Sequence, residues 1–178
     1  MSADQRRDLV LEAARIEFGQ HGYETTTTEA IARRVGVSQP YLFRLFANKR
    51  AIYLAAIEGC FDLLDELFET SSAGLTGEAA LAAMGRAYNA LLDDRTVLQL
   101  QLQMWATACY DREVRDLARR RLARLWQSAE RISGADQQRI MQFMASGMLL
   151  NVFAAMELPR IKESLGESLT GLSTTFKS

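Results

Sequence analysis

The sequence has little of the equipment on which most enzymes and metal sites depend. Its 178 residues include one histidine, His21, and two cysteines, Cys60 and Cys109. A single histidine excludes zinc sites built from several histidines. The chain also has no Gly-rich G-x-x-x-x-G-K loop and no G-x-S-x-G nucleophile turn. We therefore expect no catalytic residue, no metal site and no cofactor.

Other absences narrow the class of protein. Two cysteines cannot build a disulfide framework, and no signal peptide stands at the start. No uninterrupted apolar run reaches the roughly 20 residues that a membrane span needs. We expect a cytoplasmic protein with no membrane partner. Only 2 prolines and 11 glycines interrupt the chain, which leaves room for long helices.

Helical patterns follow one another along the whole chain. Apolar residues recur at helical spacing, and the fold class we expect is all-α. One segment is ambiguous, because Leu98, Leu100, Leu102 and Met104 alternate with glutamines as in a strand. No second strand exists to pair with it, so we predict a helix there as well. The expected helices cover about 5–20, 27–34, 39–46, 49–70, 78–92, 97–109, 113–132 and 136–156, and a last one begins at Pro159.

Several residues are typical of helix ends. Gly19 and Gly22 are expected to stop the first helix. Thr26 or Thr27 is expected to cap the second helix, and Thr26 has capping-box spacing to a following glutamate. Ser38 and Asn48 are expected to cap the third and fourth helices.

The segment 27–46 has the dimensions of a helix-turn-helix motif, with Gly36 in the turn between two short helices. In this motif the second helix enters the major groove of DNA, and its first residues reach the base edges. These residues are Ser38, Gln39, Pro40 and Tyr41. A glutamine amide can bind adenine through two hydrogen bonds, and apolar side chains can contact a thymine methyl group.

Charge follows the same boundary. Residues 28–55 hold five basic side chains and one acidic one, whereas residues 56–178 hold 13 basic and 16 acidic ones. A locally basic segment in a mildly acidic chain is the pattern expected for DNA contact. Shape and charge also fit a helical protein that merely contains such a corner, so both interpretations stay open at this point.

Residues 9–58 resemble the DNA-binding domain of the TetR (tetracycline-repressor-like) family of bacterial transcription regulators. The resemblance implies a helix-turn-helix DNA-binding domain over residues 4–64 and a helical ligand-binding and dimerisation domain over residues 65–178. The matching positions are Ala14, Phe18, Gly22, Tyr23, Thr27, Ile31, Ala32, Val35, Gly36, Val37, Ser38, Leu42, Phe46 and Lys49.

The resemblance also implies roles for single residues. Gln39 and Tyr41, with Pro40 between them, would contact bases. Phosphate contacts would come from Thr27, Thr28, Ser38, Arg44 and Lys49. Phe43 stands where the family usually has a tyrosine whose hydroxyl binds a phosphate. The missing hydroxyl should weaken the free energy of DNA binding by about 1 kcal/mol per half-site.

A ligand pocket in the second domain is expected among methionine and aromatic side chains, which suit adaptable apolar sites. The same residue types are more often plain core. Few charges lie near them, so the expected ligand is a neutral or weakly polar organic molecule. The expected ligand-binding residues are Tyr88, Met104, Trp105, Cys109, Met144 and Met148.

The segment from Met141 to Met156 is apolar almost all round, which predicts that a partner subunit covers one side. The expected protein is a homodimeric, ligand-responsive repressor that binds a palindromic DNA operator, with a small organic inducer. One alternative is a helical small-molecule-binding protein or enzyme with a helix-turn-helix-like corner. The other is a non-specific DNA binder, which the modest local charge disfavours.

Overall fold

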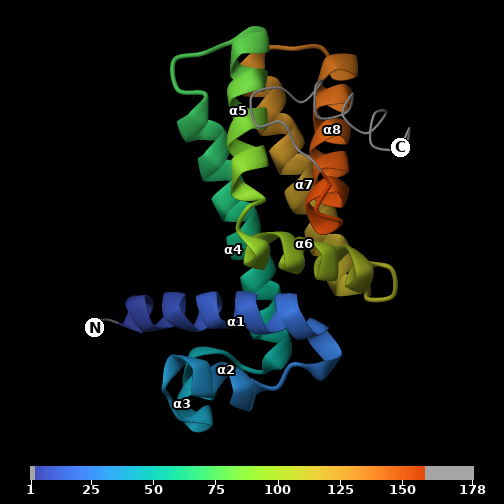
Figure 1. Cartoon of the computed structure of the whole chain (residues 1–178). Helices are drawn as coiled ribbons and strands as arrows, with labels where there is room; N and C mark the ends of the chain where they lie inside the picture. The colour runs from blue at the N-terminus through green and yellow to red at the C-terminus, as the bar shows by residue number, and fades with distance from the viewer. Residues whose placement is uncertain (1–2, 159–178) are drawn as a thin grey trace. The chain divides into compact units, whose positions relative to one another are not determined.

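The computed structural model describes residues 3–158, and over this range the chain forms eight helices and no strand (Figure 1). The all-α prediction is therefore confirmed. The helix expected from Pro159 lies outside the described residues. The helices are α1 (Ala3–Thr25), α2 (Thr28–Val35), α3 (Gln39–Leu45), α4 (Lys49–Ser71), α5 (Gly77–Leu91), α6 (Arg95–Ala108), α7 (Arg112–Ser133) and α8 (Gln137–Ala155).

The segment with the strand-like pattern is helix α6, as predicted. Leu98, Leu100 and Met104 are buried, and the polar Gln101 is buried with them. Burial of a glutamine alongside leucines explains the misleading alternation, because the inward face of this helix includes polar positions. The absence of a pairing strand was the better guide than the local pattern.

The cap of α2 is Thr27, which resolves the alternative left open by the sequence. Its hydroxyl oxygen accepts a hydrogen bond from the Ala30 N–H at 3.1 Å. Thr26 is buried, and its hydroxyl donates to the carbonyls of Glu17 and Gly22 at 3.0 and 2.7 Å. Thr26 therefore holds the end of α1 and takes no part in a capping box.

Two other predicted caps and two glycines define the remaining corners. The Ser38 hydroxyl accepts a hydrogen bond of 3.3 Å from the backbone N–H three residues further along the chain. The Asn48 side-chain oxygen accepts the equivalent hydrogen bond at 2.8 Å. The stop expected at Gly19 is wrong, because the helix continues through it, whereas Gly22 interrupts the helical conformation within α1 (φ 75°, ψ 171°) and turns the chain there. Gly36 adopts a left-handed conformation (φ 75°, ψ 32°) that suits glycine and closes α2.

The described chain divides into two compact units. Unit 1 consists of the residues up to Phe61 together with Gln99–Arg121. Unit 2 consists of Asp62–Leu98 together with the residues from Leu122 onward. The end of the first stretch lies close to the boundary predicted after residue 64. Unit 1 also takes in a segment that the sequence prediction assigned to the second domain.

Unit 1 is built around aromatic side chains. The Phe18 and Tyr23 rings lie 4.8 and 5.0 Å from the ring of Tyr53, measured between centroids. The Tyr53 hydroxyl shares a hydrogen bond of 3.1 Å with the hydroxyl of Thr107, and burial raises the pKa of Tyr53 to about 12. Helix α2 contacts both α1 and α3 (Figure 1), so this core supports the helix-turn-helix.

In unit 2, α5 and α8 lie side by side (Figure 1). Phe68 and Phe143 pack with their ring centroids 5.7 Å apart. Asn151 of α8 donates from Nδ2 to the Tyr88 hydroxyl of α5 at 2.6 Å. Among the described residues, no helix has the length and apolar character to cross a membrane.

Candidate nucleic-acid interface

Helix α3 presents its first residues to solvent. Leu42 is fully buried and holds the helix against unit 1, whereas Ser38, Gln39, Pro40 and Arg44 are exposed. Phe43 is 45% exposed, which is unusual for so large an apolar side chain. These predicted DNA-contacting residues at the start of α3 are therefore accessible to a partner.

Two of these residues contact each other. Gln39 donates from Nε2 to the hydroxyl oxygen of Thr28 at 2.7 Å, which links the start of α3 to the start of α2. Thr28 is the residue after the cap of α2, so its hydroxyl is not used for capping. The hydrogen bond ties the exposed Gln39 amide to the first residue of α2.

Tyr41 is held by arginines on two sides. Arg6 of α1 donates from Nη1 to the Tyr41 hydroxyl at 3.0 Å, and its guanidinium carbon lies 5.5 Å from the ring centroid. The guanidinium carbon of Arg44 lies 5.8 Å from the same centroid. These two cation–π contacts restrict the movement of the Tyr41 ring.

The sequence prediction did not include Arg6 or the next residue, Arg7. Arg7 donates to the carbonyl of Leu45 at 3.0 Å, and its guanidinium stacks over the Phe46 ring at 4.1 Å. Arg7 therefore fixes the end of α3. Their adjacency before the matched segment was the only signal in the sequence, and adjacent arginines alone do not show what they contact.

Lys49 was predicted to contact a phosphate. Its ammonium instead donates to the carbonyls of Tyr23, Glu24 and Thr26 at 2.8, 3.3 and 3.1 Å, and lies 4.5 Å from the Tyr23 ring centroid. An ammonium has three donors, and the three carbonyls use all of them. Lys49 closes the corner between α1 and α2, and a phosphate would have to displace one of these carbonyls.

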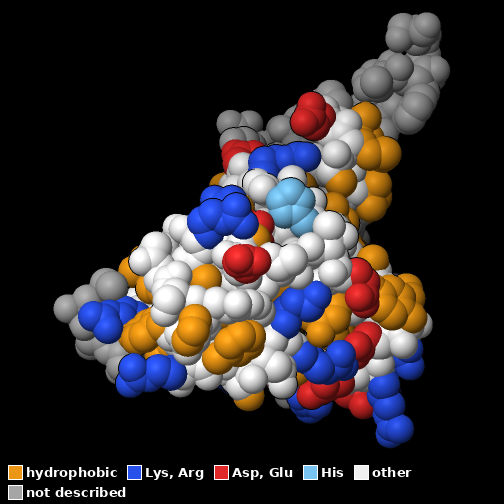
Figure 2. Space-filling view, turned by 90° about the horizontal axis from the view of Figure 1, so that it is seen from below, with side chains coloured by type: hydrophobic (Ala, Val, Ile, Leu, Met, Phe, Trp, Pro, Cys, Tyr) orange, Lys and Arg blue, Asp and Glu red, His pale blue; other side chains and the backbone are white. Residues whose placement is uncertain are grey.

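Other basic side chains near α3 are also bound within the protein. Arg34 pairs with the buried Glu17 at 2.7 Å, and Arg50 pairs with Asp111 at 2.7 Å. Figure 2 shows Lys and Arg side chains separated by hydrophobic and acidic ones, with no continuous basic surface on this face. The surface is suited to a modest number of phosphate contacts combined with contacts to bases.

The predicted ligand-binding residues belong to different units. Met104, Trp105 and Cys109 lie in unit 1, and Tyr88, Met144 and Met148 lie in unit 2. Met104 is buried, whereas Cys109 is exposed and Met148 is 50% exposed. Tyr88 is half-buried, and its hydroxyl accepts a hydrogen bond from Asn151 of the same unit.

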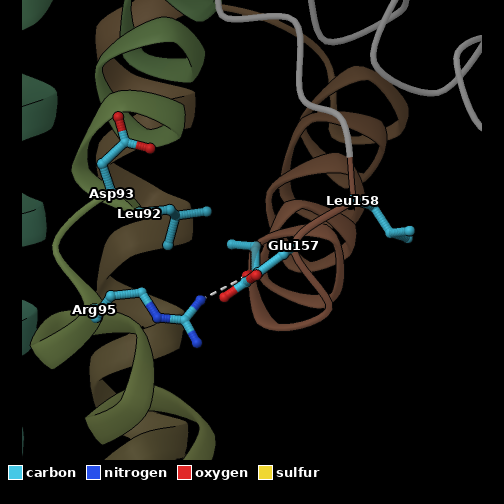
Figure 3. Close-up of a pocket in the computed structure, with 6 residues that line it drawn as sticks. Leu92, Asp93, Arg95, Glu157 and Leu158 are labelled. Carbon is cyan, nitrogen blue, oxygen red and sulfur yellow. Dashed lines mark hydrogen bonds between the residues drawn. The ribbon is translucent and has the colours of Figure 1, made fainter.

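A pocket of about 320 Å³ in unit 2 involves none of those six residues (Figure 3). Arg95 at its edge donates from Nη1 to the carbonyl of Ala154 at 2.8 Å, which closes the end of α8. The pocket is lined by Leu92, Asp93, Arg95, Ala154, Glu157 and Leu158.

Asn151 is a polar residue inside the largely apolar segment from Met141 to Met156. It is 1% exposed, and its Nδ2 donates to the Tyr88 hydroxyl and to the Gly147 carbonyl at 2.6 and 3.0 Å. Its Oδ1 is buried and has no hydrogen-bond partner among residues 3–158. An unpaired buried acceptor costs about 1–3 kcal/mol.

Within the described residues, no cluster of His, Cys, Asp or Glu has the arrangement of a metal site.

The N-terminal segment of this chain is similar in sequence to known transcription regulators. Residues 10–56 match the model of the bacterial regulatory proteins of the tetR family. The biofilm operon icaADBC HTH-type negative transcriptional regulator IcaR of Staphylococcus aureus (strain Newman) is 31% identical over 61 residues. The HTH-type transcriptional activator FasR of Mycolicibacterium smegmatis is 39% identical over 61 residues.

These matches cover 34% of this chain, and they span only 33% of IcaR and 28% of FasR. The fold extends further than the sequence match. The transcriptional regulator FadR of Bacillus subtilis, solved in complex with stearoyl-CoA, superposes with a TM-score of 0.73 at 16% identity. The superposition covers 93% of this chain and 95% of that one. The chain is thus similar to the tetR family of bacterial regulatory proteins over residues 10–56, and its fold is shared with solved transcriptional regulators.

Proposed function

We propose that this chain is a cytoplasmic, sequence-specific DNA-binding repressor that binds a palindromic operator as a homodimer and responds to a small organic ligand. The exposed start of α3 carries the DNA-binding part of the proposal. Within this helix, Gln39 and Tyr41 are each held by a hydrogen bond from another helix. Gln39, Pro40 and Tyr41 would read bases, and Thr27, Thr28, Ser38 and Arg44 would contact phosphates.

Repression is the simpler of two modes of regulation, because blocking a promoter requires only occupancy of the DNA. Activation needs a further contact with the transcription machinery. The relatives include both kinds, since IcaR is a negative regulator and FasR is an activator. A promoter reporter with and without the protein distinguishes the two.

The homodimer is supported by the outer face of α8. Met141, Met148, Val152 and Met156 recur at helical spacing and are 61, 50, 42 and 59% exposed. A contiguous apolar stripe of this kind marks an interaction surface. Covering it with the same stripe of a second copy would produce the two-fold symmetry that a palindromic operator requires.

The ligand is proposed to be neutral or weakly polar and to bind in the helical part of unit 2. FadR, which shares the fold, was solved with stearoyl-CoA, so this architecture can accept a long organic molecule. A hydroxyl or amide donor on the ligand would satisfy Asn151 Oδ1 beside Tyr88. Coupling between ligand and DNA must be reciprocal, so each weakens the binding of the other by the same factor.

Selection of bound sequences from a random duplex pool at physiological salt tests the proposal. The wild type should enrich a palindrome, and Gln39→Ala should relax one position in each half. Gln20→Ala, at an exposed position of α1, is the matched control and should leave the motif unchanged. No enrichment by the wild type would remove the DNA-binding proposal. A helical carrier whose corner only looks like a helix-turn-helix would then become the leading account.

A further inference from the structure

We propose that Thr28 determines the base preference of this protein by orienting the amide of Gln39. The inference deepens the proposed function and rests on it. Thr28 lies on α2 and was expected only to touch the phosphate backbone. Its hydroxyl oxygen accepts a hydrogen bond from Gln39 Nε2 at 2.7 Å, a short distance for a neutral pair of this kind.

The donors and acceptors of the pair explain why this contact favours one base. A glutamine amide has two N–H donors and one carbonyl acceptor. Thr28 takes one N–H, which leaves one N–H and the carbonyl oxygen. Adenine presents one acceptor, N7, and one donor, N6–H, in the major groove. The groups that remain on Gln39 are therefore complementary to adenine.

Preorganisation adds to this complementarity. Gln39 is exposed, and a free glutamine side chain samples many rotamers that it must give up on binding. The hydrogen bond to Thr28 removes part of that freedom before DNA arrives, which lowers the cost of binding.

A phosphate contact by Thr28 makes a different prediction. The hydroxyl of Thr28 accepts from Gln39, so its own proton can still donate to a phosphate. Loss of a phosphate contact weakens binding to all sequences about equally. Loss of orientation changes the preference at the base pair that Gln39 reads. The two roles are therefore separated by measuring discrimination between bases as well as overall affinity.

The test compares Thr28→Val with Thr28→Ser in the full chain. Valine keeps the shape of threonine without the hydroxyl, and serine keeps the hydroxyl. Thr27 supplies the cap of α2, so neither variant removes it, and equal melting temperatures would verify that both fold. We expect Thr28→Val to lower discrimination for the preferred base about fivefold, and Thr28→Ser to stay within about twofold of the wild type.

Two further readouts make the result decisive. Thr28→Val should change nothing at that base pair when Gln39→Ala is already present, because Thr28 acts through Gln39. In the free protein, the NMR signals of the Gln39 side-chain amide should move in Thr28→Val. In Thr28→Ser they should keep their wild-type positions. The second measurement requires no DNA.

A wild-type motif that Thr28→Val weakens uniformly, with unchanged base preference, would overturn the inference and leave the proposed function standing. An unchanged Gln39 amide signal in Thr28→Val would also overturn it. A wild type that enriches no motif would overturn the proposed function, and the specificity role with it.

Discussion

Nη2 of Arg50 lies 2.7 Å from both carboxylate oxygens of Asp111, which joins the first turn of α4 to the start of α7 within unit 1. The same guanidinium donates from Nε to Glu113. Asp111 also accepts from the Val114 N–H at 3.0 Å and so caps α7. One carboxylate thus serves as a helix cap and as an ion-pair partner, and substitutions can separate these two roles.

The first prediction concerns the stability of this contact. Asp111→Asn keeps an oxygen for the cap and removes the charge, and it should lower the free energy of unfolding by about 0.5–1 kcal/mol at pH 7. Asp111→Ala removes both roles and should cost about 1–2 kcal/mol. Urea unfolding of the two variants and the wild type measures the difference.

The pH dependence has a defined sign. The Val114 N–H and then Arg50 hold the pKa of Asp111 below its usual value of about 3.8. A carboxylate with a lowered pKa stabilises the fold above its unfolded pKa, and this contribution is lost as the pH falls through the folded value. The difference between wild type and Asp111→Asn should therefore shrink below about pH 4. A difference that persists unchanged at pH 2 would contradict the ion-pair role.

The second prediction concerns Lys49. Lys49→Met removes the three hydrogen bonds to the carbonyls at the α1–α2 corner and should lower the free energy of unfolding by about 2 kcal/mol. The salt dependence of operator binding should stay the same, because the ammonium is already used. Chemical denaturation and binding titrations at several salt concentrations measure the two effects.

Arg44→Gln is the matched comparison for Lys49. Arg44 is exposed on α3, so its substitution should leave stability unchanged and lower the salt slope by about 1 per half-site. If Lys49→Met lowered the slope by the same amount, Lys49 would contact a phosphate after all.

The third prediction concerns the exposed Phe43. Phe43→Tyr adds a hydroxyl to a side chain that is already 45% exposed and should not disturb packing. The family resemblance places a phosphate next to this hydroxyl, so binding should tighten about fivefold per half-site for every sequence. Electrophoretic or fluorescence titrations against the selected operator and a scrambled duplex measure the change. Tightening on the operator alone would mean that the hydroxyl contacts a base.

The same residues show how far the sequence alone could lead. Helix positions, the α6 assignment and the Ser38 and Asn48 caps follow from local spacing and side-chain chemistry, and the structure confirms them. The partners of Lys49 do not follow, because the three carbonyls come together only where the chain turns at Gly22. Local patterns show which residues are polar and accessible. They do not show which of them are already bound within the protein.

Long-range partners are the general reason for the remaining differences. Arg6 and Tyr41 are 35 residues apart, and Tyr88 and Asn151 are 63 residues apart. No spacing rule links such pairs. The sequence could therefore name Tyr41 and Tyr88 as candidates, whereas their hydrogen bonds with Arg6 and Asn151 appear only in the structure.

The last prediction concerns the apolar stripe of α8. Met148→Glu places a carboxylate in the middle of the stripe, and in a two-fold dimer it would do so once from each copy, in an apolar contact. The wild type should sediment as a dimer at micromolar concentration and Met148→Glu as a monomer with unchanged helicity. Leu75→Glu is the control, because Leu75 is 40% exposed but lies in the loop between α4 and α5. It should remain a dimer.

If both variants dissociated, general surface charge would be responsible. If neither dissociated, the dimer would form through another surface. Operator affinity should fall with dimerisation in Met148→Glu alone, since a single copy can occupy only one half of a palindrome.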